Sequence, residues 1–179
     1  MPAVELWDTF FDPAAVLPRM GVDRDIDLLI DIGCGYGTFI LPAASMVKRV
    51  LGIDIDPGMI DHCRKMIAEQ DRANIDLLLD DVSTGSCDAY RGSADYVSLF
   101  NILHCEDPVS LLWKARSLAK PNGRIGVIHW KYEKTPRGPS MEIRPRPEQI
   151  IDWAASIGLR LDTQVDLPPY HFGLIFKIV

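Results

Sequence analysis

Three glycines at alternate positions, placed directly after a short apolar run, constrain the fold of this chain more than any other stretch. Residues 28–32 (LLIDI) read as a strand buried on both faces, and Gly33, Gly35 and Gly37 follow. Such glycines let the backbone turn sharply and approach a ligand where any Cβ would intrude. A helix-like run begins near residue 36, and its free N–H groups and positive dipole end would face a polar or anionic group. We therefore expect a nucleotide-type pocket at the carboxyl end of a parallel strand.

Length and charge limit the classes of protein to which the chain can belong. Its 179 residues and 20.1 kDa fit one domain, residues 1–179. The net charge of −6 and pI near 5.1 disfavour a nucleic-acid partner held by a basic face. No apolar run approaches the roughly 20 residues of a membrane span, and the first ten residues lack a basic region followed by an apolar one. We expect a cytoplasmic protein with no membrane partner.

The four cysteines, at positions 34, 63, 87 and 105, show no Cys-x-x-Cys spacing. Neither a zinc site nor a disulfide framework is indicated, so we expect no bound metal and reduced, mostly buried thiols. Cys105, near the expected rim of the pocket, leaves a thiol-based reaction or the binding of a soft metalloid open.

Apolar strand-like runs alternate with helix-like runs along most of the chain, which is typical of a parallel α/β sheet. The Asp56–Pro57 pair signals a helix start, and residues 120–123 (KPNG) signal a turn. The last two apolar runs, separated by Pro168 and Pro169, read as an antiparallel hairpin. The expected strands are 28–32, 49–55, 73–82, 94–100, 123–130, 159–167 and 171–179, and the expected helices are 38–47, 57–70, 109–119 and 148–158.

These runs carry motifs that resemble those of class I S-adenosylmethionine-dependent methyltransferases. The segment from Asp31 to Gly37 resembles their motif I, (D/E)-x-G-x-G-x-G. Residues 94–105 resemble motif IV, with Cys105 in place of its second histidine, and residues 118–124 resemble L-K-P-G-G-x, with Asn122 in place of the first glycine. The resemblance covers about residues 27–179. It implies a Rossmann-like fold with a seven-stranded, mostly parallel sheet in the order 3-2-1-4-5-7-6 and helices on both faces.

The expected cofactor site combines spacing with this resemblance. Asp54 lies 23 positions after Asp31, close to the roughly 20-residue offset at which an acid meets a ribose, and a carboxylate can accept hydrogen bonds from both ribose hydroxyls. The resemblance implies S-adenosylmethionine as cofactor, S-adenosylhomocysteine as product, and Asp54 as the ribose ligand. It also implies an acid for the adenine amino group, for which we prefer Asp81 to Asp80, although both aspartates also fit a solvated loop. The residues expected to bind the cofactor are Asp31, Gly33, Cys34, Gly35, Gly37, Asp54, Ile55, Asp81, Val82, Phe100 and Asn101.

His104 and His129 are the candidate catalytic residues, because each follows or ends a strand at the ligand edge and histidine transfers protons near neutral pH. Each also fits a buried histidine with a satisfied hydrogen bond. We expect in-line methyl transfer to a small molecule. One alternative is an S-adenosylmethionine-binding module without transfer activity, acting as a sensor or partner subunit. A dinucleotide oxidoreductase is a further alternative, but its Gly-x-Gly-x-x-Gly turn is absent.

Two segments beside the expected pocket allow a structural and a functional reading. Residues 1–25 form an irregular amphipathic lead-in, which either packs on the core or forms a lid. Residues 131–147 form a long proline-rich loop, which is either a surface connector or a substrate-side wall. The final hairpin exposes an edge strand and so leaves a homodimer open.

Overall fold

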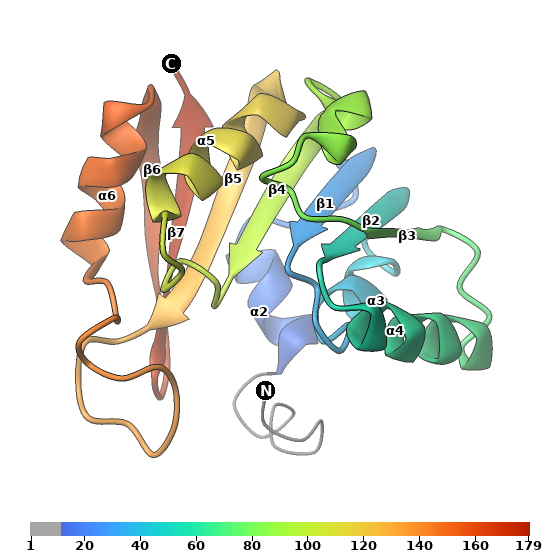
Figure 1. The fold of residues 1–179 in the computed structure, drawn as a ribbon, viewed down its shortest axis with the longest axis horizontal. Coiled ribbons are helices and arrows are strands. Elements are labelled where there is room, and N and C mark those ends of the chain that lie inside the picture. Colours follow the sequence, from blue (N-terminus) through green and yellow to red (C-terminus); the bar gives the residue numbers. More distant parts are fainter. Residues whose placement is uncertain (1–11) are drawn as a thin grey trace.

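A computed structural model describes residues 12–179 and contains one seven-stranded sheet in the order β3-β2-β1-β4-β5-β7-β6 (Figure 1). The first five strands run parallel, and β7 is antiparallel to both of its neighbours. The predicted fold class and strand order are therefore confirmed. The strands are β1 (Leu28–Ile32), β2 (Arg49–Asp54), β3 (Ile75–Leu79), β4 (Ala94–Phe100), β5 (Ala119–Trp130), β6 (Leu159–Leu167) and β7 (His171–Ile178).

Helices cover both faces of this sheet, and each face has its own hydrophobic cluster (Figure 1). On one face, α2 (Pro13–Arg19), α3 (Ile40–Ala43) and α4 (Pro57–Glu69) bury their apolar side chains. On the other, the 3₁₀ helix η1 (Ser86–Tyr90), α5 (Pro108–Leu118) and α6 (Pro147–Ser156) do so. Within residues 12–179, no helix has the length and apolar character that crossing a bilayer requires.

Three helices begin with the same dipeptide, an aspartate followed by proline. The carboxylates of Asp12, Asp56 and Asp107 accept hydrogen bonds from backbone N–H groups in the first turn at 3.2, 2.7 and 3.0 Å. The proline that follows each aspartate already has the helical φ and needs no intrahelical partner. The start predicted at Asp56–Pro57 is confirmed.

The helix predicted over residues 38–47 is wrong in its length, because α3 contains only Ile40–Ala43. Gly37, with φ +85°, keeps the chain out of helical conformation before α3. After Ala43 the chain continues in tight turns, and Pro42 inside α3 supplies no N–H donor. The glycine-rich loop therefore does not lead directly into a long helix whose N-terminus faces the ligand.

The turn predicted at residues 120–123 is also modified, since the structure includes it in β5. The register with β4 jumps from Ala94–Ala119 to Tyr96–Arg124, so four residues of β5 bulge out of the pairing. Pro121 has no N–H for a ladder, and a Cβ on Gly123 would lie 2.9 Å from the carbonyl oxygen of Ala94. The turn residues thus interrupt the strand without ending it.

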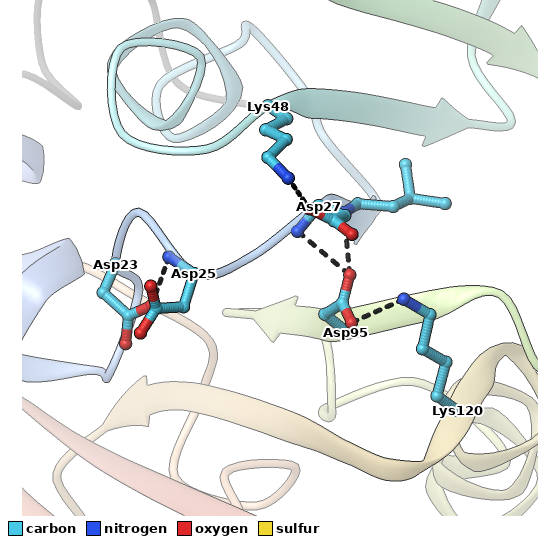
Figure 2. Close-up of polar contacts among 7 residues, drawn as sticks. Asp23, Asp25, Asp27, Lys48, Asp95 and Lys120 are labelled. Carbon is cyan, nitrogen blue, oxygen red and sulfur yellow. Dashed lines mark hydrogen bonds and ion pairs between the residues drawn. The ribbon is translucent and has the colours of Figure 1, made fainter.

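Asp95 joins β4 to the beginning of β1 at the amino edge of the sheet (Figure 2). Its Oδ2 atom accepts the N–H groups of Asp27 and Leu28, both at 3.0 Å, and its Oδ1 atom accepts Lys120 Nζ at 2.6 Å. Lys48 pairs with the Asp27 carboxylate beside it. These contacts hold the two central strands together at the edge opposite to the one where their carboxyl ends meet.

Candidate functional site

A cavity of about 610 Å³ opens at the carboxyl ends of the parallel strands, the place where open α/β sheets bind ligands. One part of its lining follows β1, β2 and β3, and the other follows β4 and β5. The predicted residues in the first part are Gly33, Cys34, Gly35, Asp54, Ile55, Asp81 and Val82, and those in the second part are Phe100, Asn101 and His104. Asp31, Gly37 and His129 do not line the cavity.

The glycine-rich loop has a backbone conformation that residues with side chains rarely adopt. The φ angles of Gly33, Gly35 and Gly37 are +75°, +53° and +85°. A Cβ on Gly33 would lie 2.4 Å from Ile102 Cδ1. The loop therefore presents bare backbone to the cavity, as a cradle for a ligand requires. Gly37 does not line the cavity but packs against α4, where a Cβ would lie 3.2 Å from Cys63 Sγ.

Asp54 ends β2 with a carboxylate that is held in place from two sides. Its Oδ2 atom accepts the N–H of Gly35 at 2.8 Å, and its Oδ1 atom accepts the N–H of Asp56 at 2.9 Å. A carboxylate offers about four lone-pair sites, so each oxygen retains one for a further donor. Since the residue is only 6% exposed and lines the cavity, these sites suit a vicinal diol.

The two aspartates after β3 differ in their surroundings. Asp81 Oδ1 accepts the N–H of Ser83 at 2.9 Å, and hydrogen bonds from Ser83 lower the pKa of this carboxyl. Asp80 is buried, and within residues 12–179 its Oδ2 atom has no hydrogen-bond partner. Both aspartates line the cavity. Asp80 was not among the selected residues, and the only signal for it in the sequence is its place beside Asp81.

Asp31, the acid of motif I, lies buried between the central strands. Its Oδ1 atom accepts Ser98 Oγ of β4 at 2.5 Å. Burial raises the pKa of Asp31 to about 7, with a further contribution from the nearby Asp54 charge and against the effect of the Ser98 hydrogen bond. Asp31 therefore links β1 to β4 inside the sheet, and the cavity surface is formed by its neighbours Ile32 and Gly33.

Asn101 follows β4 in a left-handed conformation, with φ +57°. This conformation is uncommon for residues other than glycine and costs least for asparagine and aspartate. Its N–H donates to Ile128 O at 2.7 Å, whereas its buried Oδ1 atom has no partner within the described residues. The turn places Asn101 and Phe100 on the cavity wall, and the Phe100 ring packs edge-on against Phe39 with centroids 4.7 Å apart.

His104 lines the cavity, and His129 is completely buried behind it. Their ring centroids are 5.6 Å apart. Burial lowers the pKa of His104, and the positive charge of Arg144 contributes; burial lowers the pKa of His129 to about 3. Both rings are therefore neutral at pH 7, but only His104 can touch a ligand directly.

One wall of the cavity is formed by Trp130 together with Arg137, Gly138 and Pro139. Three residues of the loop 131–147, which the sequence allows to be a surface connector or a substrate-side wall, line the cavity, whereas Trp130 is not among the expected site residues. The N-terminal segment is described only from residue 12, and Val16 and Leu17 of α2 are buried in the core. Any lid formed by residues 1–11 lies outside the described residues.

These features fit an adenosine-containing sulfonium cofactor. The bare backbone of the glycine-rich loop leaves room for a ligand to lie directly against it. Asp54 retains acceptor sites for a ribose diol. Within residues 12–179, Asp80 has a buried carboxylate oxygen without a hydrogen-bond donor. An amino group on the ligand would supply that donor.

Comparison with known proteins agrees with this geometry. A family model described as "Methyltransferase domain" matches residues 29–123. The chain is 35% identical over 100 residues to aklanonic acid methyltransferase DauC of a Streptomyces species, an alignment that covers 54% of this chain and 45% of DauC. It is 26% identical over 162 residues to the ubiquinone biosynthesis O-methyltransferase of Coxiella burnetii, covering 80% of this chain and 67% of that protein. The chain thus spans about half to two thirds of the length of these relatives.

Solved structures show the same fold. A crystal structure described as a SAM-dependent methyltransferase from Aquifex aeolicus superimposes with a TM-score of 0.86 at 24% identity, covering 95% of this chain and 91% of that one. Motifs, strand order, cavity and family model agree with one another. The chain therefore belongs to the methyltransferase domain family, in its class I fold with S-adenosylmethionine as cofactor.

Proposed function

We propose that this chain is an S-adenosylmethionine-dependent methyltransferase that acts on a small molecule by in-line methyl transfer. The observation that carries the proposal is that two different sets of residues line one and the same cavity. Acidic and glycine residues that suit a nucleoside follow β1 to β3, and a largely apolar wall that also carries Asn101, His104 and Arg137 follows β4 and β5. The names of DauC and the Coxiella burnetii relative, which refer to aklanonic acid and to ubiquinone biosynthesis, support a small-molecule acceptor.

The cofactor supplies a methyl group that is already activated on a positively charged sulfur. The chain's main contribution is then to hold the acceptor and the methyl group in line, and such alignment is worth about 7–11 kcal/mol for well-oriented reactants. Asp54 and the glycine loop fix the nucleoside end, while Phe100 and Asn101 lie where the strand order changes and border the reacting end.

His104 is the residue that we propose as the base for an acceptor that must lose a proton. It lines the acceptor side, and its lowered pKa keeps the ring unprotonated at neutral pH. His129 lies behind His104 and contacts it ring to ring, so we propose that it supports the His104 ring without touching the acceptor.

Calorimetry with S-adenosylhomocysteine tests the cofactor half of the proposal. We expect micromolar binding by the native chain and a loss of about 100-fold or more for Asp54→Ala, because two charge-assisted hydrogen bonds of about 1.5–3 kcal/mol each disappear. Asp61→Ala is the matched control, since Asp61 is an exposed aspartate of α4 paired with Arg64. Absence of binding by the native chain would contradict the proposal.

Transfer of a labelled methyl group to a panel of small hydroxyl, thiol, amine and carbon acceptors tests the second half. Turnover with at least one class supports the enzyme. Intact S-adenosylhomocysteine binding without turnover on any class would favour the alternative, a binding module that acts as a sensor or a partner subunit.

A further inference from the structure

The segment between β5 and α6 is held around one buried side chain, Arg144. Residues 131–146 contain no helix or strand, yet Arg144 is only 5% exposed. Its Nη1 atom donates to the carbonyl oxygens of Lys131 and Glu133, both at 2.9 Å, and to Thr135 Oγ1 at 3.1 Å. Its Nη2 atom donates to Pro139 O at 2.7 Å and to Arg137 O at 3.4 Å, and Nε donates to Pro139 O at 3.3 Å.

The acceptors of this guanidinium are all uncharged oxygens within the described part of the chain. A buried cation that is compensated by carbonyl dipoles alone gains less than one paired with a carboxylate. What the arrangement provides is geometry, because a planar fork with five N–H groups fixes several carbonyl groups at once. A lysine ammonium carries the same charge but lacks the planar guanidinium, so it cannot bind the same set of carbonyl groups at once.

Two of the four carbonyl groups held by Arg144 belong to residues that line the cavity. Arg137, Gly138 and Pro139 form part of its lining, and Arg144 binds the carbonyl oxygens of the first and the last of them. The middle residue, Gly138, has φ +105°, and a Cβ there would lie 2.7 Å from Trp130 Cδ2 and 2.9 Å from Arg144 Nη2. The loop backbone thus lies directly on the Trp130 ring.

Trp130 is the surface against which this loop is held. It is 2% exposed and lines the cavity at the end of β5. The Arg144 guanidinium lies 5.6 Å from its ring centroid on the loop side, and the His171 ring lies 4.1 Å from it, centroid to centroid. The Arg144 guanidinium thus binds the backbone of residues 137 and 139 beside Trp130, and none of the oxygens that it binds belongs to the residues at the nucleoside end of the cavity.

We propose that Arg144 is a positioning residue that fastens the loop 131–146 onto Trp130 and so sets the shape of the acceptor half of the cavity. The part that concerns the acceptor rests on the proposed methyltransferase function. The part that concerns the loop does not, because it can be measured without turnover.

Limited trypsin digestion with mass spectrometry measures how firmly the loop is held. The exposed residues Lys134 and Arg137 precede cleavable peptide bonds inside the loop. We expect cleavage after them to be at least tenfold faster in Arg144→Met and Arg144→Lys than in the native chain. Arg160→Met, which removes an exposed arginine of the edge strand β6, is the control and is expected to leave the cleavage rate unchanged. Should Arg144→Met fail to fold, Arg144→Lys, which retains the charge, gives the same measurement.

Kinetics separate loop positioning from a general loss of structure. With an acceptor found in the methyl-transfer panel, we expect the Arg144 variants to raise the acceptor KM at least tenfold. Their S-adenosylhomocysteine affinity is expected to stay within twofold of the native value. In Gly138→Ala the added Cβ would clash with the Trp130 ring, so the loop must move away from it, and we expect this variant to raise the acceptor KM as well.

Native-like cleavage rates in both Arg144 variants would overturn the inference. So would an acceptor KM that does not change, or a parallel loss of cofactor affinity, because the latter would assign Arg144 to the stability of the whole fold. Failure of the methyltransferase proposal has a different signature, namely no S-adenosylhomocysteine binding by the native chain, and it leaves the cleavage comparison intact.

Discussion

At the scale of single residues, the acids around the cavity divide into those whose oxygens already have partners and one whose oxygen does not. Both Asp54 oxygens accept backbone N–H groups and keep a free site each, and Asp81 caps its own turn. Asp80 alone has a buried oxygen without a partner within residues 12–179. A buried oxygen of this kind is costly unless a ligand supplies a donor.

We therefore predict that Asp80→Ala weakens S-adenosylhomocysteine binding more than Asp81→Ala does. Loss of one hydrogen bond to a charged acceptor is worth about 1.5–3 kcal/mol, which corresponds to roughly 10–100-fold in the dissociation constant. Asp81→Ala removes a turn contact and is expected to cost less than that. Titration calorimetry on both variants decides the matter. A larger loss of affinity in Asp81→Ala than in Asp80→Ala would contradict this prediction and assign the adenine contact to Asp81, which the resemblance to the family motif favours.

His104 gives a second prediction at this scale. If the acceptor must lose a proton, His104→Gln is expected to lower kcat by about 10²–10⁴-fold and to leave S-adenosylhomocysteine affinity unchanged. Because the pKa of His104 is lowered by burial and by Arg144, protonation inactivates the base only below its ordinary pKa of 6.5. The native pH–rate profile should accordingly fall on an acidic limb below pH 6.5. Unchanged kcat in the variant would show that the acceptor needs no base or uses another one.

At the scale of secondary structure, the two edges of the sheet have separate roles. The carboxyl ends of the strands form the cavity, and the amino ends carry ion pairs and caps, of which Asp95 with its contacts to β1 and Lys120 is the central one (Figure 2). Although partial burial opposes ionisation, the bonds from Lys120 and from two backbone N–H groups hold the pKa of Asp95 below its ordinary value.

Asp95→Ala tests this division of roles. Its removal leaves two strand N–H groups and one ammonium without their acceptor, so we expect a loss of about 1–3 kcal/mol in the free energy of unfolding. Affinity for S-adenosylhomocysteine is expected to stay unchanged, because the contact lies at the opposite edge from the cavity. Urea denaturation measures the first quantity and calorimetry the second. Asp76→Ala, which breaks the exposed pair with Arg49, serves as the control and should cost less than about 1 kcal/mol.

Strand positions were predictable from the apolar runs, and the strand order was predictable through the resemblance of the ordered motifs to those of class I methyltransferases. Asp54 was predictable for a related reason: a strand end fixes where its last side chain lies. The length of α3 was not, because Gly37 and Pro42 interrupt a run whose composition otherwise suits a helix. Trp130 ends the expected strand 123–130, so the same strand-end signal was present for it and was not used. Arg144 was missed because its role depends on the path of an irregular loop, which no sequence period encodes.

At the scale of the whole molecule, buried titratable groups link folding to pH in opposite directions. Burial lowers the pKa of both His129 and His171 to about 3, so between pH 6.5 and 3 the unfolded chain binds up to two protons that the folded chain rejects. Stability therefore falls as pH drops through this range. Asp31, with its pKa raised to about 7, takes up a proton in the folded state first and stabilises the fold as pH drops from 7 to 3.8.

For these three groups the histidines outweigh Asp31 by about one proton near pH 5, which corresponds to a loss of up to about 1.4 kcal/mol per pH unit on acidification. His129→Gln removes one of the two protons that only the unfolded chain binds. The slope of the unfolding free energy against pH should therefore decrease by up to about 1.4 kcal/mol per pH unit. Asp31→Asn should steepen it by a similar amount, because the stabilising proton uptake is lost. Urea denaturation of the native chain and both variants between pH 4.5 and 7 measures the slopes. Parallel curves for His129→Gln and the native chain would mean that the His129 ring becomes protonated within the folded protein, since only then does its removal leave the proton balance of unfolding unchanged.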